Sequence, residues 1–371
     1  MAPPEEEEAL VDAVGALGPP LLQTLDALEK AARYLHPPLI HGLRRTLAPL
    51  APALEDGLRA FETGAAGAGE NGAVRQLGEA GRLAREALGL FLDGSPGPDA
   101  TRRVLMSLRM HARAQAALYP LHTALPPVNR YFLEPALWPR AESLDPDPAP
   151  LARVGVHDAH NAEDQRGGFT FYAPEWLLPD KPRPLVVVLH GGSGHGASFL
   201  WTWLREARSR GFFLLSATSR GPTWSLHGAD LDAEPLDSMI AFVSERWPVD
   251  PARILVTGLS DGATYSLLYG LRTSAPCSAI APVSGVLHPV NFANGNMQRA
   301  RGRRIHLVHG RLDWLFPVGL ARAAAEELER AGADLVYREI EDLSHTYPRE
   351  ANDAILSWFD PLLVLPAAEA G

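Results

Sequence analysis

One stretch constrains the fold more than any other part of the sequence: Ile254-Leu-Val-Thr-Gly-Leu-Ser260-Asp-Gly262-Ala-Thr-Tyr-Ser-Leu-Leu-Tyr269. Residues compatible with a β-strand lead to a glycine, one serine follows, and a helical pattern comes after it. A strand that reverses sharply into a helix forces the residue at the turn, here Ser260, into a strained backbone conformation. The residues two positions away on either side then come too close for a Cβ atom, and both are glycine, Gly258 and Gly262. The spacing G-x-S-x-G therefore predicts a turn that presents the Ser260 hydroxyl.

On this reasoning Ser260 is a candidate nucleophile, because such a turn holds its apical side chain free to meet a substrate. A tight surface turn with an exposed serine would satisfy the same short pattern. The β-compatible residues before Gly258 and the helical pattern after Gly262 favour the strand-to-helix turn.

Apolar runs and helical patterns alternate on both sides of this turn. Leu151 to His157 and Gly168 to Ala173 are expected to form an opening pair of strands. Further strands are expected at 185–189, 212–216, 254–257, 279–283, 305–308 and 335–340, with helices at 197–210, 236–246, 260–271, 318–331 and 349–359. Continuous apolar strands separated by helices favour a mostly parallel sheet covered by helices on both faces. Such a sheet binds ligands at the carboxyl ends of its strands.

The region before this alternation is predicted to be a small all-helical bundle. Its apolar residues recur at spacings of three and four: Leu21, Leu22, Leu25 and Leu28; then Leu43, Leu47, Leu50, Leu54, Leu58 and Phe61; then Val74, Leu77, Leu83, Leu88 and Phe91. A fourth helix is expected from Thr101 to Leu118. We expect the leucines to form a core and the scattered histidines to have structural roles: His36, His41, His111 and His122.

Prolines and acidic residues separate the two regions, and Asp145-Pro-Asp-Pro-Ala-Pro150 cannot hold a helix. We therefore expect a helical bundle over residues 1–140, a Pro/Asp-rich linker over 141–150 and an α/β domain over 151–371. The bundle could act as a lid, as a surface for homo-oligomer formation, or as a support for the second domain.

Composition narrows the classes of partner. The formal net charge is -10, with 44 acidic against 34 basic residues and no basic cluster, which argues against a nucleic-acid partner. The single cysteine, Cys277, cannot form an internal disulfide, which fits a reducing compartment. The start of the chain, Met1-Ala-Pro-Pro-Glu-Glu-Glu-Glu, is acidic and no long apolar segment follows it. We therefore expect a cytoplasmic protein without a signal peptide or a membrane span.

Four motifs in residues 151–360 resemble those of the α/β-hydrolase superfamily. They are the turn at Gly258–Gly262, His190-Gly-Gly-Ser-Gly194 after the third strand, His309-Gly-Arg-Leu-Asp313-Trp-Leu-Phe-Pro317 after a late strand, and Leu343-Ser-His345-Thr-Tyr347 after the last strand. Nucleophile, acid and base follow one another in the order that this fold uses. The motifs look most like serine esterases of the phospholipase/carboxylesterase and the polyester-depolymerase or feruloyl-esterase type. The N-terminal bundle is not a standard part of those families.

The resemblance implies an α/β-hydrolase fold and a role for each motif. Ser260 would attack a carboxylic ester, and His345 would take its proton, since an imidazole ordinarily titrates near neutrality. Asp313 would hold the imidazole and stabilise its charged form. The main-chain N–H groups of Gly192 and Asp261 would bind the developing oxyanion. This chemistry needs a small-molecule ester and neither a metal nor an organic cofactor, and a peptidase, amidase or thioesterase would use the same triad.

Other residues compete for these roles or could surround them. The alternatives to His345 are His309, which we expect to be a structural histidine at a strand end, and His288, which stands in an irregular stretch. The alternatives to Asp313 are Glu341 and Asp342, which are too near His345 in the sequence and are expected to face solvent. Aromatic residues near the predicted catalytic loops are candidate substrate-binding residues: Trp224, Trp314, Phe316 and Tyr347. The stretch from Leu287 to Arg303 looks too irregular for a helix and could overhang the site.

Two hypotheses from other classes remain open on the sequence. Gly192-Ser-Gly194-His-Gly-Ala197 matches the dinucleotide-binding pattern G-x-G-x-x-A and would suit an NADP-binding oxidoreductase. That pattern is usually followed about twenty residues later by an acidic residue, whereas Ser216-Ala-Thr-Ser-Arg220 stands there. A non-catalytic binding module on a hydrolase fold is disfavoured, because none of the reactive positions is replaced.

Overall fold

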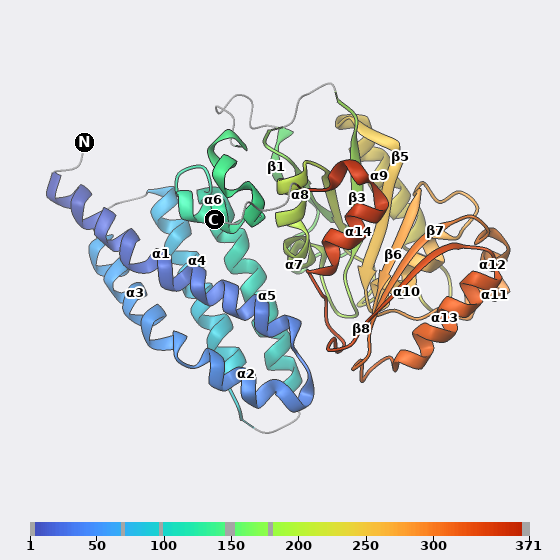
Figure 1. The fold of residues 1–371 in the computed structure, drawn as a ribbon. Coiled ribbons are helices and arrows are strands. Elements are labelled where there is room, and N and C mark those ends of the chain that lie inside the picture. The colour runs from blue at the N-terminus through green and yellow to red at the C-terminus, as the bar shows by residue number, and fades with distance from the viewer. Residues whose placement is uncertain (1–3, 68–70, 96–98, 145–152, 177–180, 366–371) are drawn as a thin grey trace. The chain divides into compact units, whose positions relative to one another are not determined.

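The structure is a computed structural model that describes residues 4–67, 71–95, 99–144, 153–176 and 181–365 (Figure 1). The chain divides into two compact units, Met1–Leu133 and Glu134–Gly371. The 3-10 helix η3 (Pro135–Leu144) belongs to the second unit. The boundary between the two units therefore lies before residue 140, the end that the sequence predicts for the bundle. Three side chains of η3 are buried, Leu137, Ala141 and Leu144. Residues 145–150 of the expected linker lie outside the described residues.

The first unit is helical, as the sequence predicts. Its elements are α1 (Pro4–Arg33), η1 (Pro37–Leu39), α2 (Ile40–Leu47), α3 (Leu50–Gly64), α4 (Gly72–Leu92), α5 (Ala100–Leu118), η2 (Tyr119–Leu121) and α6 (Pro126–Tyr131). Leucines of the predicted stripes, such as Leu25, Leu58 and Leu88, are buried and form its core. The buried His111 places its Nε2 atom 2.9 Å from the carbonyl oxygen of Leu25, which is a structural role.

One predicted helix of this unit is interrupted. The apolar spacing continues from Leu43 to Phe61, yet α2 ends at Leu47 and α3 begins at Leu50. Pro49 lies between them and has no N–H to donate to the preceding turn. The sequence pattern hides this break, because Leu47 before it and Leu54 after it are both buried.

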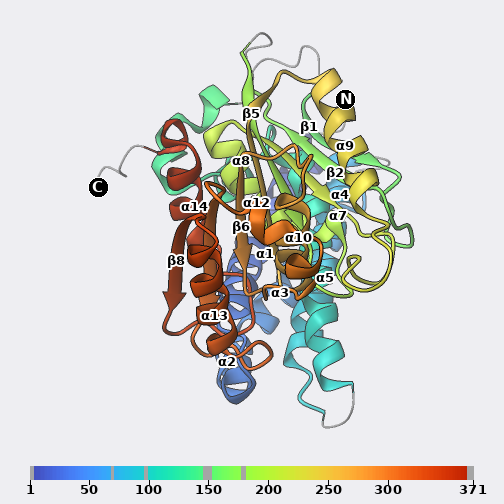
Figure 2. The ribbon, with the colours of Figure 1, turned by 90° about the vertical axis from the view of Figure 1, so that its right-hand side faces the viewer.

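The second unit is built on an eight-stranded sheet with the order β1-β2-β4-β3-β5-β6-β7-β8. The strands are β1 (Gly155–Ala159), β2 (Phe169–Ala173), β3 (Arg183–Leu189), β4 (Phe213–Ala217), β5 (Val249–Leu259), β6 (Ala279–Val283), β7 (Arg304–Gly310) and β8 (Asp334–Ile340). Strand β2 pairs antiparallel with β1 and with β4, and every other pairing in the sheet is parallel. Figure 2 shows β8 on one side of this unit and β1 and β2 on the other. The mostly parallel sheet confirms the predicted fold class.

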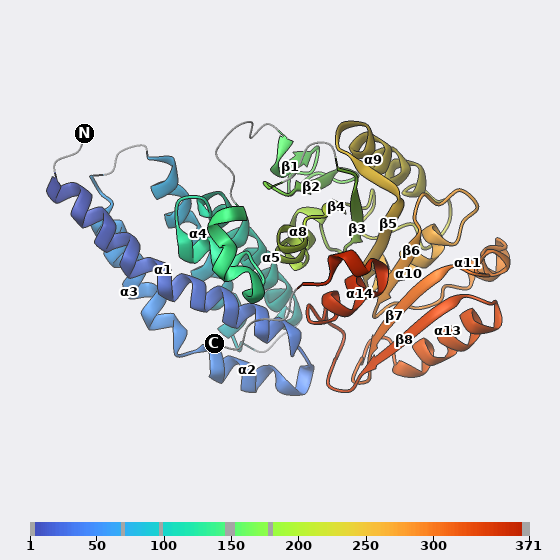
Figure 3. The ribbon, with the colours of Figure 1, turned by 45° about the horizontal axis from the view of Figure 1, so that its top comes forward.

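Helices cover both faces of this sheet (Figure 3). They are α7 (Gly196–Phe199), η5 (Leu200–Thr202), α8 (Leu204–Arg210), α9 (Ala233–Arg246), α10 (Asp261–Gly270), α11 (Val290–Ala293), α12 (Asn296–Arg299), α13 (Val318–Arg330), α14 (Ala351–Phe359) and η6 (Pro361–Leu363). Side chains of α9, α10 and α13 share one core cluster with Leu185 and Val187 of β3. Helices α8 and α14 lie on the other face (Figure 3). The loops at the carboxyl ends of the parallel strands are therefore left to form a site.

Two segments differ from their expected structure. The helix expected over 197–210 is divided into α7, η5 and α8, and the completely buried Trp203 lies between η5 and α8. The stretch 287–303, expected to contain no helix, contains the short helices α11 and α12. The buried Asn296 donates its side-chain N–H to the carbonyl oxygen of Leu268, 3.0 Å away, and so ties this stretch to α10. Such long-range contacts are not visible in local periodicity.

Candidate active site

The turn between β5 and α10 has the strained geometry that the glycine spacing predicts. Ser260 has φ +56° and ψ −118°, and φ is positive although the residue is not glycine. A Cβ atom built on Gly262 would lie 2.2 Å from the carbonyl oxygen of Leu189 on β3, and one on Gly258 would lie 2.7 Å from the same oxygen. Neither position can hold a side chain without moving the backbone. The two glycines therefore allow the turn to pack against β3 while Ser260 stands at its apex.

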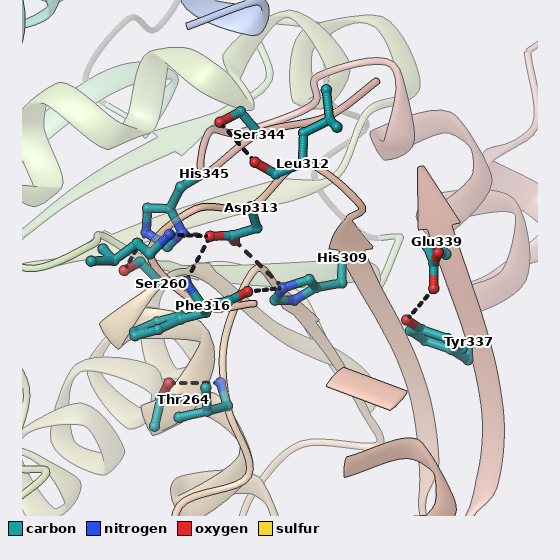
Figure 4. Close-up of polar contacts among 12 residues, drawn as sticks. Ser260, Thr264, His309, Leu312, Asp313, Phe316, Tyr337, Glu339, Ser344 and His345 are labelled. Carbon is teal, nitrogen blue, oxygen red and sulfur yellow. Dashed lines mark hydrogen bonds and ion pairs between the residues drawn. The ribbon is translucent and has the colours of Figure 1, made fainter. Parts of the chain in front are cut away.

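The structure brings Ser260, His345 and Asp313 into one row (Figure 4). The Nε2 atom of His345 lies 2.9 Å from Oγ of Ser260, and its Nδ1 atom lies 2.8 Å from Oδ2 of Asp313. Ser260 follows β5, Asp313 follows β7 and His345 follows β8, so three loops at the carboxyl edge of the sheet contribute one group each. Ser260 is 8% exposed, and the carboxylate of Asp313 is closed off from solvent. In this geometry an imidazole can take a proton from a hydroxyl on one side while a carboxylate holds it on the other.

The carboxylate of Asp313 is fixed by its own loop. Its Oδ1 atom accepts hydrogen bonds from the main-chain N–H groups of Leu315, at 3.0 Å, and Phe316, at 2.7 Å. Its Oδ2 atom is therefore left to face His345. The ring of Phe316 meets the ring of His345 edge to face, with centroids 5.1 Å apart. The loop thus fixes the Asp313 carboxylate and, through Phe316, packs against one side of the His345 imidazole.

The fully buried His309 lies behind this loop and not in the row itself. Its Nε2–H donates to the carbonyl oxygen of Phe316, 2.8 Å away, and lies 3.5 Å from Oδ2 of Asp313. Burial lowers the pKa of His309 and so favours the neutral ring. The Phe316 carbonyl oxygen then favours the tautomer with its proton on Nε2. The sequence suggested His309 as a competitor of His345, whereas the structure places it as a support for the Asp313 loop. Its position four residues before Asp313 in the same motif was the available signal.

The two main-chain N–H groups expected to bind an oxyanion lie beside the serine. Gly192 follows β3 and Asp261 follows β5, and these strands are neighbours in the sheet. A Cβ atom built on the preceding Gly191 would lie 3.5 Å from the Cβ atom of Ser260, so this segment passes directly alongside the serine. Among the described residues, neither the Gly192 nor the Asp261 N–H donates a hydrogen bond. Both groups are free to meet a ligand oxygen.

The loop after β4 is fastened to the segment His190–Gly194. The main-chain N–H of Ser219 donates to Nε2 of His190 at 3.1 Å, that of Ser193 donates to the carbonyl oxygen of Pro222 at 2.9 Å, and the indole N–H of Trp224 donates to the carbonyl oxygen of His190 at 2.7 Å. This brings Thr223 to the site, where its hydroxyl donates to Oδ2 of Asp261 at 2.6 Å. Thr223 is not among the site residues that the sequence predicts. No local motif marks it, because its position depends on contacts between two loops.

The four candidate pocket aromatics lie in different surroundings. Trp224 is 3% exposed and stacks on Tyr265, and Tyr347 is buried with its hydroxyl donating to Oδ1 of Asn352 at 2.8 Å. Both therefore pack in the protein interior and do not form an open pocket wall. Phe316 is half-buried against His345, and Trp314 is 55% exposed on the same loop. Only these two remain candidates for contact with a substrate.

Among the other competitors for catalytic roles, Glu341 and His288 make contacts with residues outside the row. Glu341 is exposed and forms an ion pair with Arg311, and Asp342 is exposed as well. His288 meets His227 edge to face, with ring centroids 5.6 Å apart. The structure therefore joins Ser260 to His345 and Asp313 and to none of these.

Most N–H groups of the segment Gly192–Ala197, which a dinucleotide phosphate would require, already donate within the protein. The N–H of Gly194 donates to the carbonyl oxygen of Gly191 at 2.9 Å, and that of Gly196 donates to the hydroxyl of Thr218 at 2.9 Å. The N–H of Ala197 donates to Nδ1 of His195 at 3.2 Å. The helix that follows, α7, ends at Phe199. The local structure thus argues against the dinucleotide hypothesis.

Two further findings concern the part of the chain that the structure describes. Within it, no group of three or more His, Cys, Asp or Glu side chains is arranged to hold a metal ion. None of its helices combines the length and the apolar character needed to cross a membrane.

Comparison with known proteins shows a similarity to one protein family. Residues 234–360 match the model of the phospholipase/carboxylesterase family. The chain matches no curated protein. Solved structures similar to it include a thermostable esterase (20% identity, covering 52% of this chain and 55% of that one, TM-score 0.40), the acetyl xylan esterase from Aspergillus awamori (15%, 55% and 98%, 0.44) and an S-formylglutathione hydrolase from Agrobacterium tumefaciens (16%, 57% and 95%, 0.44). Residues 234–360 are therefore similar to the phospholipase/carboxylesterase family, and the chain is a carboxylic ester hydrolase of the α/β-hydrolase fold.

Proposed function

We propose that the chain cleaves small carboxylic esters through an acyl-enzyme on Ser260, with His345 as general base and Asp313 as the acid that holds it. One observation carries this proposal: the imidazole of His345 lies within hydrogen-bond distance of the Ser260 hydroxyl on one side and of the Asp313 carboxylate on the other. The strained turn at Ser260 supports it, because it holds the hydroxyl at the apex where a substrate carbonyl can approach.

In the first half of the reaction the Ser260 oxygen attacks the ester carbonyl while its proton moves to Nε2 of His345. The tetrahedral intermediate carries a negative oxygen, which the N–H groups of Gly192 and Asp261 stabilise together with the positive end of α10. Collapse of the intermediate breaks the bond to the alcohol, which leaves with the proton from His345. In the second half, water gives a proton to His345 and attacks the acyl carbon. The bond from that carbon to the Ser260 oxygen then breaks, His345 returns its proton to this oxygen, and the acid is released.

The experiment that tests this proposal compares three proteins on a series of p-nitrophenyl esters. Ser260→Ala removes the nucleophile and is expected to lower kcat by a factor of roughly 10⁴ or more. Ser238→Ala, an exposed serine on α9, is the matched control and is expected to behave as the wild type. Thermal unfolding of all three checks that Ser260→Ala leaves the fold intact. Turnover by folded Ser260→Ala at the wild-type rate would contradict the proposal.

A second measurement addresses the covalent step. Mass spectrometry of protein quenched during turnover is expected to show one acyl group on the peptide that contains Ser260, and none in Ser260→Ala. The same panel, extended with a thioester and a peptide anilide, decides which carbonyl compounds the triad accepts. A preference of kcat/KM for the anilide over all esters would replace the esterase proposal with a peptidase one.

A further inference from the structure

A carboxylate that ester hydrolysis does not itself require lies beside the proposed oxyanion site. Asp261 contributes its main-chain N–H to that site, and its half-buried side chain turns toward Gly192. A Cβ atom built on Gly192 would lie 2.6 Å from Oδ2 of Asp261. The carboxylate therefore occupies the space where a side chain at position 192 would begin. Gly192 leaves room for the carboxylate next to its own N–H.

A negative charge at this place works against hydrolysis of a plain ester. The oxygen that Gly192 and Asp261 would bind becomes negative in the transition state, and like charges a few ångströms apart repel each other. A neutral side chain at position 261 would avoid this cost. The charge becomes favourable when the substrate itself carries a hydrogen-bond donor that binds the Asp261 carboxylate.

The Asp261 carboxylate is held ready for such a donor. Thr223 donates its hydroxyl to Oδ2 at 2.6 Å, and the loop that carries Thr223 is fastened to the segment His190–Gly194 by the three hydrogen bonds described above. Within the described residues, Oδ1 of Asp261 accepts no hydrogen bond. The Thr223 oxygen also keeps a lone pair after it has donated its proton. The pair thus offers a fixed carboxylate oxygen and a hydroxyl oxygen as acceptors.

The order of the strands places this pair on the acyl side of the ester. His345 follows β8 and must hand its proton to the leaving alcohol, so the alcohol has to lie next to the His345 imidazole. Gly192 follows β3 and Thr223 follows β4, and both strands lie on the opposite side of β5. A group that meets Thr223 and Asp261 is therefore attached to the acyl chain, close to its carbonyl carbon.

We propose that Thr223 and Asp261 select esters whose acyl chain carries a hydroxyl or an ammonium group on carbon 2 or carbon 3. The inference rests on the proposed function, because it needs the acyl group on Ser260 and the oxyanion at Gly192. A donor at either carbon reaches a carboxylate beside the oxyanion site, whereas an unsubstituted acyl chain leaves that charge without a partner. A hydrogen bond from such a donor to a carboxylate is stronger than one between neutral groups.

The test measures kcat/KM of the full chain for four p-nitrophenyl esters: butyrate, 2-hydroxybutyrate, 3-hydroxybutyrate and 3-aminobutyrate. We expect at least one substituted ester to exceed butyrate by roughly tenfold to a hundredfold, after correction for its uncatalysed hydrolysis. The hydroxy esters and the amino ester are separate arms that distinguish a neutral donor from a charged one. Equal values for all four esters would overturn the inference.

Three variants tie the preference to these residues. Asp261→Asn keeps the main-chain N–H and loses the charge, so the preference should fall by roughly tenfold while kcat for plain butyrate rises. Thr223→Val removes the hydroxyl at nearly constant volume and should also reduce the preference, whereas Thr223→Ser restores the donor and keeps it. An unchanged preference in Asp261→Asn, or equal losses of all four activities in it, would show that the carboxylate does not select the acyl group.

Failure of this inference can be separated from failure of the proposed function. A wild type that hydrolyses all four esters equally, and that loses them all in Ser260→Ala, keeps the proposed function and overturns only the acyl selection. A wild type that retains its turnover in Ser260→Ala overturns the proposed function and this inference with it.

Discussion

The Nδ1 atom of His345 lies 2.8 Å from Oδ2 of Asp313, although the two residues are 32 positions apart and follow different strands. Both oxygens of this carboxylate are engaged, one by His345 and the other by the N–H groups of Leu315 and Phe316. The imidazole therefore presents its Nε2 atom to Ser260 in a fixed direction. The predictions below follow from this row of groups and from the packing that holds it.

Replacing the carboxylate with an amide should remove most of the activity without unfolding the protein. In Asp313→Asn the side-chain N–H₂ can face Nδ1 of His345, which favours the tautomer that carries its proton on Nε2 and cannot accept the one from Ser260. We expect kcat to fall roughly 10³- to 10⁴-fold with a smaller change in KM. The exposed Asp334 on β8 provides the control, and Asp334→Asn should keep the wild-type kcat. A kcat within threefold of the wild type in Asp313→Asn would rule out its role.

The buried His309 should affect catalysis through the position of the Asp313 loop. His309→Leu removes the donor to the Phe316 carbonyl oxygen, and we expect kcat to drop about ten- to a hundredfold with little change in KM, because small displacements of catalytic groups are costly. His309→Gln can place an N–H near the same oxygen and should recover part of the loss. If both variants lost stability equally and kept kcat in the folded fraction, His309 would be a packing residue only.

The glycines of the turn should not tolerate a methyl group. In Gly262→Ala the new Cβ would lie 2.2 Å from the Leu189 carbonyl oxygen, so β5, α10 or β3 must move. We expect a loss of about 1–3 kcal/mol in the free energy of unfolding or more, together with a large loss of kcat because Ser260 moves. Gly319→Ala on α13 is the matched control, since a Cβ there meets nothing within 4 Å. Urea unfolding of both variants gives the comparison, and equal stabilities would contradict the steric argument.

Stability should decrease in mildly acidic solution because of His306. Burial lowers the pKa of this histidine from 6.5 to about 4, and Arg338 adds to the effect. The folded state then binds fewer protons than the unfolded state between these pH values, so the free energy of unfolding falls as the pH drops through 6.5 and levels off below about 4. Each tenfold difference in proton affinity is worth about 1.4 kcal/mol, which gives an upper limit of roughly 3–4 kcal/mol.

Urea unfolding at pH 7 and pH 5 measures this dependence. His306→Leu removes the titrating group and should make the difference between the two pH values smaller than in the wild type. A variant whose stability depends on pH as strongly as that of the wild type would assign the effect to other groups.

Much of the site was predictable because its motifs are local. The steric demands of the turn at Ser260 act between residues a few positions apart, and Gly258 and Gly262 record them in the sequence. The order of Ser260, Asp313 and His345 along the chain matches the order of the strands that carry them. Most strands of the sheet were also predictable from continuous apolar runs, because a strand that is buried on both faces consists mainly of apolar residues.

Burial of single side chains was less predictable. Trp224 and Tyr347 stand near catalytic loops in the sequence, yet both are packed in the interior, while Trp314 from the same set is exposed. The breaks at Pro49 and Trp203 were hidden for a related reason, because the apolar period continues across them. Local spacing reports which residues are apolar and does not report which neighbour covers them.

The sequence by itself determined the strand-to-helix turn at Ser260 and the alternation of strands and helices, because both depend on interactions between residues that are close along the chain. Only the tertiary structure decided that His309 supports the Asp313 loop and that Thr223 holds the Asp261 carboxylate beside Gly192. Those contacts form where separate loops meet at one edge of the sheet. Their geometry depends on the packing of whole elements, and no spacing in the sequence encodes it.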